Sequence, residues 1–210
     1  CWGGWSGWRG MLVLEASTGR VLEGHVLGAK FSGASWRGDG FYYSAYDAPV
    51  AWKEFSNVNE NHKIYYHAIG TPQSSDELIF QNPKQPKRFY SASCPEDENV
   101  LFIYESGANR GNALYIKDPT KKNSPVIALA TNDEFQYYPI EVMGDDVYFY
   151  TNYQAPKGKV MKANLNKPQL EHWTDLVPEN ESVLSSPGII GGKMFLTYDQ
   201  DASNHAYVYD

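Results

Sequence analysis

The sequence lacks the features of a membrane-spanning or disulfide-stabilised chain. No apolar run approaches the ~18 residues that a membrane-spanning helix needs, and the start carries no signal-peptide pattern. Two cysteines, Cys1 and Cys94, are too few for a disulfide framework, and we expect Cys94 to be a small core residue. These absences predict a soluble protein, either cytoplasmic or periplasmic, and they do not choose between the two compartments.

Positive charge and helical periodicity are also scarce. The 210 residues include 18 Lys and Arg against 25 Asp and Glu, which gives a net charge of −7. Such a chain does not attract phosphate backbones, so we expect neither a nucleic-acid nor a membrane partner. No window of about 11 residues repeats its apolar positions at helical spacing, which argues against long helices.

Aromatic residues, glycine and proline are what the sequence has in excess. It contains 16 Tyr, 9 Phe and 6 Trp, together with 18 Gly and 12 Pro. Aromatic side chains favour strands, whereas Gly and Pro favour turns. A hydrophobic content of 42% is enough to build a core. The composition therefore favours strands and turns over helices.

Two strand motifs recur along the chain and keep step with each other. The first is aromatic-rich, as in Phe41-Tyr-Tyr-Ser-Ala-Tyr46, and its copies start at positions 41, 101, 147 and 194. The second, as in Ile64-Tyr-Tyr-His-Ala68, starts at positions 12, 64, 114, 160 and 206. Weaker strand patterns open each unit at 31–36, 89–93, 137–142 and 183–186, and close it at 77–80, 126–130 and 173–177. The shared phase indicates units of about 46–52 residues with four strands each.

Repeated units of four antiparallel strands are typical of a β-propeller, in which each blade buries its faces against the next. We therefore predict an all-β propeller fragment of about four four-stranded antiparallel blades, three complete and two partial. The predicted blades are 1–26 (the end of one), 31–81, 87–130, 135–178 and 182–210 (incomplete). A β-sandwich is the alternative, but it does not explain a period of about 46 residues. Open blade edges would also allow the chain to associate with itself.

Clusters of metal-ligating residues are weak in this sequence. His62 and His67 are five positions apart, so in one strand their side chains would point to opposite faces. The acidic stretches at 96–98 and 145–146 fit solvated hairpin turns better than calcium loops. We therefore predict no metal site and no cofactor.

Two blocks in the first half of the chain carry a family resemblance. Residues 31–44 read FSGASWRGDGFYYS, and residues 61–76 read NHKIYYHAIGTPQSSD. With residues 112–118 and 176–179, they resemble the propeller of the prolyl oligopeptidase family, serine peptidases that cleave short peptides after proline. The resemblance covers roughly residues 6–210, with Gly7 standing where the family usually has Asp.

The resemblance implies a seven-bladed propeller that covers an α/β-hydrolase domain and admits only short peptides. In that family the hydrolase domain carries the catalytic Ser, Asp and His, and this sequence has no Gly-x-Ser-x-Gly elbow. We therefore expect a substrate-gating part without catalytic residues, whose partners are the hydrolase domain of the parent enzyme and short proline-containing peptides. A stand-alone propeller that binds peptides or proteins without enzymatic activity is the alternative, because this fold serves many functions.

Three substrate-binding positions also follow from the resemblance. It aligns Tyr42, Phe89 and Ala108 with propeller residues that line the substrate cavity of the family. Apolar and aromatic side chains suit subsites beyond the proline pocket. For Tyr42 and Phe89, packing within a blade is the alternative interpretation.

Overall fold

The computed structural model describes residues 2–3, 9–47 and 59–209. The chain divides into two compact units, Cys1–Gly107 and Ala108–Asp210, and each is described by itself. Strands dominate both units, and within the described residues no helix is long and apolar enough to cross a membrane. The two short 3-10 helices are η1 (Gln73–Ser75) and η2 (Leu170–His172).

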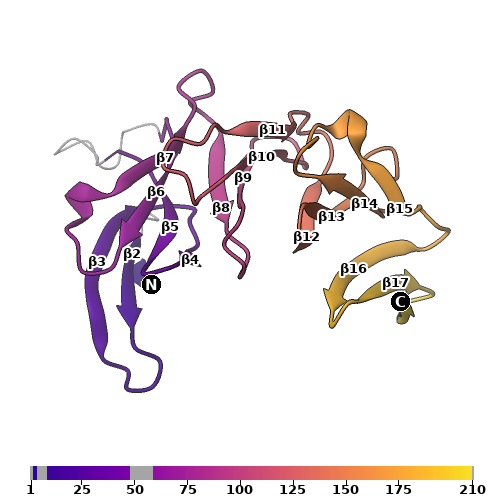
Figure 1. Ribbon diagram of the computed structural model, residues 1–210, viewed down its shortest axis with the longest axis horizontal. Helices are drawn as coiled ribbons and strands as arrows, with labels where there is room; N and C mark the ends of the chain where they lie inside the picture. The colour runs from indigo at the N-terminus through magenta and orange to yellow at the C-terminus, as the bar shows by residue number, and fades with distance from the viewer. Residues whose placement is uncertain (1, 4–8, 48–58, 210) are drawn as a thin grey trace. The chain divides into compact units, whose positions relative to one another are not determined.

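The first unit contains the strands from indigo to magenta in Figure 1. They are β1 (Trp2–Gly3), β2 (Arg9–Leu14), β3 (Val21–Ala29), β4 (Ser35–Arg37), β5 (Gly40–Ala45), β6 (Lys63–Ala68), β7 (Glu77–Gln81), β8 (Phe89–Ser93) and β9 (Leu101–Ser106). One sheet has the order β1-β2-β3-β5-β6-β7, with β4 paired to β5, and β8 pairs with β9. All of these pairings are antiparallel.

The second unit continues the same pattern. Its strands are β10 (Ala113–Lys117), β11 (Ile127–Ala130), β12 (Tyr137–Met143), β13 (Asp146–Thr151), β14 (Lys159–Asn164), β15 (Thr174–Val177), β16 (Val183–Ile190), β17 (Lys193–Gln200) and β18 (Ser203–Tyr209). β10 pairs with β11, β12 to β15 form a four-stranded antiparallel sheet in sequence order, and β16 to β18 form a three-stranded one.

Both repeating motifs are strands, as the sequence predicts. Copies of the first motif are β5, β9, β13 and β17, and copies of the second are β2, β6, β10, β14 and β18. The weaker opening and closing patterns are strands as well, except that β4 begins at Ser35 rather than at Phe31. The blade boundaries proposed above stay predictions.

A one-residue irregularity recurs in the closing strands. One residue in each drops out of the ladder with the preceding strand: Ile79 in β7, Leu129 in β11 and Leu176 in β15. Such β-bulges bend a strand and increase its twist. Their repetition at one place in successive units indicates that the units share a local geometry as well as a sequence rhythm.

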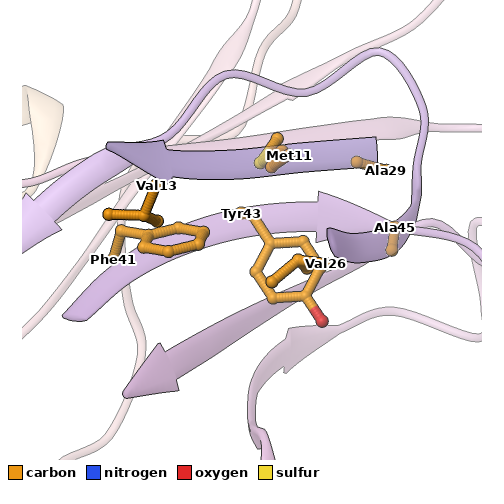
Figure 2. Close-up of a cluster of buried hydrophobic side chains, with 7 residues drawn as sticks. All are labelled: Met11, Val13, Val26, Ala29, Phe41, Tyr43 and Ala45. Atoms are coloured by element: carbon orange, nitrogen blue, oxygen red, sulfur yellow. The ribbon is translucent and has the colours of Figure 1, made fainter. Parts of the chain in front are cut away.

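Apolar side chains from neighbouring strands fill each unit. In the first unit, β2, β3 and β5 contribute a cluster that Figure 2 shows from the side: Met11, Val13, Val26, Ala29, Phe41, Tyr43 and Ala45. In the second unit, Val160 from β14 packs with Leu184 of β16 and with Leu196 and Tyr198 of β17. The first cluster lies within one sheet, whereas the second joins β14 to β16 and β17 of the next sheet. In the second unit, successive sheets therefore bury their faces against each other, as blades do.

Candidate functional site

Tyr42 lies in β5, a strand buried along its whole length between β4 and β6. Its side chain is 3% exposed, and its ring lies 5.1 Å from the ring of Tyr66. Burial raises the pKa of the Tyr42 hydroxyl to about 12, although nearby Arg37 opposes the shift. This environment favours the packing interpretation of Tyr42 over direct contact with a ligand.

Phe89 is placed very differently. It is the first residue of β8, its side chain is 37% exposed, and its ring meets the ring of Phe31 edge-on at 5.2 Å. Phe31 is 62% exposed. We call Phe31 and Phe89 the aromatic pair. Two exposed phenylalanines in contact form an apolar surface of the kind that binds apolar side chains.

Ala108, the third predicted position, belongs to the second unit. It lies in the bend that follows β9 and is exposed. Its methyl group is therefore accessible to solvent, and its role in substrate binding stays a prediction.

The backbone of Phe31 has an unusual conformation. Its φ angle is +52°, in the left-handed region that costs a bulky residue roughly 1–3 kcal/mol. Hydrogen bonds hold the chain on both sides: His62 Nε2 donates to the Lys30 carbonyl at 2.9 Å, and the Ser44 amide donates to Ser32 Oγ at 2.7 Å. Such strain persists where surrounding structure imposes it, and it is concentrated at functional sites.

His62 connects the two halves of the aromatic pair. Its imidazole is fully buried, and its Nδ1 accepts a hydrogen bond of 2.9 Å from the amide of Tyr90, next to Phe89. Since Nδ1 accepts and Nε2 donates to Lys30, the ring is the neutral tautomer with its proton on Nε2. Burial lowers the pKa of His62, and the bond to Lys30 opposes this shift.

His67 belongs to a different hydrogen-bond network, which is centred on Asp76. Its Nδ1 donates to Asp76 Oδ1 at 2.7 Å, and the hydroxyl of Tyr43 donates to Asp76 Oδ2 at 2.6 Å. Gln73 supports Tyr43 from η1 and bonds both backbone groups of Leu27. Throughout the part of the chain that the structure describes, no three His, Cys, Asp or Glu side chains gather as a metal site would require.

Phe31 is the member of the aromatic pair that we did not select from the sequence. A signal for it exists, because residues 31 and 89 each begin an opening strand pattern in consecutive units. Equivalent positions in a propeller repeat lie on equivalent parts of neighbouring blades. What the sequence does not reveal is the left-handed backbone at Phe31, which keeps this residue outside β4.

Comparisons with known proteins agree on one family. The family model described as "Prolyl oligopeptidase, N-terminal beta-propeller domain" matches residues 5–210. A prolyl endopeptidase from Elizabethkingia meningoseptica is 36% identical over 99% of this chain, and prolyl oligopeptidase A from Galerina marginata is 30% identical over 91%. The chain spans about 29% and 27%, respectively, of the lengths of these relatives.

Solved structures show the same likeness in three dimensions. A structure from a study of two prolyl endopeptidases, which concerns inter-domain dynamics, superimposes with a TM-score of 0.87 at 30% identity. It covers 99% of this chain, which matches 30% of that structure. Prolyl oligopeptidase B from Galerina marginata, bound to a 35-residue substrate, shares the fold with a TM-score of 0.80, 24% identity and 93% coverage of this chain. These likenesses confirm the predicted propeller fold, with a blade count that is approximate.

Proposed function

Because the chain belongs to the prolyl oligopeptidase family, as part of its N-terminal β-propeller domain, we propose that it is the substrate-gating part of a serine endopeptidase. The parent enzyme would cleave short peptides after proline, and this chain would not cut bonds itself. Its sequence has no Gly-x-Ser-x-Gly elbow to carry a nucleophile. The partners in this proposal are an α/β-hydrolase domain and short proline-containing peptides.

The aromatic pair is the observation that carries the proposal. Phe31 and Phe89 remain exposed, whereas Phe41 and Phe102 of the same unit are buried. A rigid aromatic surface binds an apolar peptide side chain with little loss of conformational entropy, because each ring has only two side-chain torsions. The pair would thus supply one wall of a peptide site in the first unit. Ala108, in the second unit, stays a predicted substrate contact that is considered by itself.

Positioning is the contribution to catalysis that such a wall can make. A peptide held in one orientation against a reacting group avoids much of the entropic cost of the reaction. The hydrolase domain would supply the nucleophile, and the propeller would restrict access to peptides that fit between them. Tyr42 would act from within the blade, by packing against Tyr66 rather than by touching peptide.

The test is a comparison of kcat and KM in the parent enzyme with single substitutions. Phe31→Ala and Phe89→Ala should each raise KM for a Gly-Pro chromogenic peptide about 10-fold, the effect of losing roughly 1.4 kcal/mol of apolar contact, and should change kcat less. Trp36→Ala is the matched control, because Trp36 is another exposed aromatic residue of the same unit. An unchanged KM in both phenylalanine variants would refute the proposal that the aromatic pair contacts peptide. An equal rise in KM in Trp36→Ala would refute it as well.

A further inference from the structure

One buried imidazole links the backbone segments that carry the aromatic pair. His62 lies directly before β6, donates to the carbonyl of Lys30 and accepts from the amide of Tyr90. Lys30 precedes Phe31, and Tyr90 follows Phe89. Each of the two phenylalanines is therefore one residue away from an atom that His62 holds.

Ring contacts strengthen this connection. The His62 ring contacts two aromatic rings. It lies 6.1 Å from the ring of Phe89, in an edge-on arrangement, and 4.6 Å from the ring of Tyr46. Tyr46 and Tyr90 are both buried. The imidazole is thus packed between aromatic side chains, and its orientation is fixed by packing as well as by two hydrogen bonds.

We propose that His62, in its neutral form, is a positioning residue that holds Phe31 and Phe89 together as one rigid surface, and that protonation of its imidazole separates them. The proposal rests on the proposed function only where it assigns that surface to peptide binding. The coupling between His62 and the two phenylalanines is a property of the fold itself.

The hydrogen-bond pattern explains why protonation would act on the pair. A protonated imidazole has a donor on both nitrogens, so Nδ1–H would face the Tyr90 amide, which is also a donor. The Tyr90 amide would lose its acceptor in a buried setting, which is costly. The β8 end that carries Phe89 would then have to move, or the imidazole would have to rotate and release Lys30.

The charged groups around His62 do not offset this effect. Ionisable side chains on the neighbouring segments are Lys30, Tyr46, Asp47, Glu60, Lys63, Lys87, Arg88 and Tyr90, and Arg88 pairs with Glu105 of β9. Lys30 bonds Asn59 at 3.3 Å and lies over the Phe31 ring, while Lys63 and Asp47 pair with each other. Among the described residues, no carboxylate pairs with the His62 imidazole to stabilise its charged form.

The direction of the pH dependence follows from burial. The folded protein lowers the pKa of His62 below the ordinary value of histidine, so the folded state favours the neutral ring. The stabilising contribution of the neutral ring is therefore present above the ordinary histidine pKa and is lost as the pH falls through and below it. The aromatic pair should be intact at neutral pH and should open on the acid side.

Nuclear magnetic resonance of the 210-residue chain tests the coupling without any peptide or catalysis. Three signals are followed during a pH titration: the ring nitrogen shifts of His62, the ring-to-ring contact of Phe31 and Phe89, and hydrogen exchange of the Tyr90 amide. We expect the ring contact to disappear in the same transition in which His62 takes up its proton. A ring contact that persists after His62 is protonated would overturn the proposal.

Two variants and a control separate positioning from general stability. His62→Gln can donate to Lys30 and accept from Tyr90 without titrating, so it should keep the ring contact at neutral and at acid pH. His62→Ala should weaken the contact at every pH and accelerate exchange of the Tyr90 amide about 10-fold. His205→Gln, at an exposed histidine of β18, should leave the titration unchanged. Acid loss of the contact in His62→Gln would contradict the proposal.

Kinetics of the parent enzyme then distinguish failure of this inference from failure of the proposed function. If the parent enzyme cleaves peptides, KM should rise on the acid side in the natural protein and less so in His62→Gln, with kcat affected less. If no peptide is cleaved, the proposed function fails while the resonance data still decide the role of His62. If peptides are cleaved and KM shows the same pH profile in both proteins, the positioning role in binding is refuted.

Discussion

Three buried polar side chains of the first unit, those of Tyr43, His67 and Asp76, form one hydrogen-bonded network. Asp76 accepts from both Tyr43 and His67, and Gln73 adds a bond to the Tyr43 hydroxyl. Burial and the bond to Asp76 raise the pKa of Tyr43 above its ordinary value. A buried carboxyl group that loses one of its donors pays a large desolvation cost, so this network should contribute to stability as a unit.

Removal of the Tyr43 hydroxyl tests that network. Tyr43→Phe keeps the ring in the cluster of Figure 2 but takes a donor from Asp76, and should lower the free energy of unfolding by about 2 kcal/mol. Urea unfolding at neutral pH measures the change. Tyr207→Phe, at an exposed tyrosine of β18, is the control and should stay within about 0.5 kcal/mol of the natural protein. Equal effects of both substitutions would show that the network adds no stability.

Single residues also mark the limits of what the sequence reveals. Tyr42 is in a strand that is buried on both faces, so alternation along the strand cannot separate a ligand-facing residue from a core residue. Phe31 has a left-handed backbone conformation that the local sequence does not predict. His62 forms its hydrogen bonds with backbone atoms that are about 30 residues away in the sequence on either side. These features depend on tertiary contacts, and therefore they emerge only from the structure.

At the scale of elements, the sequence is far more informative. Strand positions follow from two motifs with a common period, because each repeated unit has the same order of strands and buries the same strands. β8 coincides with its predicted span, Phe89–Ser93, at both ends. The sequence does not predict the recurrent bulges in β7, β11 and β15, because strands of four or five residues are too short for one unpaired residue to show as a break in alternation.

The closing part of the sheet β12 to β15 depends on one buried aromatic stack. Trp173 lies directly after η2, its ring stacks on Phe149 of β13 at 4.3 Å, and its Nε1 donates to the Pro168 carbonyl at 2.8 Å. Trp173→Ala should therefore lower the free energy of unfolding by about 4 kcal/mol, through the cavity and the lost hydrogen bond.

Thermal or urea unfolding followed by circular dichroism measures this effect. The matched control is Trp36→Ala, since the side chain of Trp36 is 53% exposed and its contact with Phe41 is at the edge of the first unit's sheet. We expect that control to cost about 1 kcal/mol or less. A loss at Trp173 no larger than the loss at Trp36 would be inconsistent with the buried stack.

At the scale of the whole molecule, the chain is part of the N-terminal β-propeller domain of a peptidase family. The family model covers residues 5–210. The chain spans 29% of the length of the Elizabethkingia meningoseptica relative, which is therefore more than three times as long. We therefore propose that this chain contacts the peptide and controls its access, and that a hydrolase domain cleaves the bond.

The assignment of cleavage to another domain is tested most directly by a peptidase assay on two samples at equal molarity. One is the 210-residue chain alone, and the other is the parent protein with its hydrolase domain. We expect that the chain alone does not cleave a Gly-Pro chromogenic peptide above the buffer rate, whereas the parent protein does. Sustained turnover by the chain alone, in a preparation free of other peptidases, would contradict it.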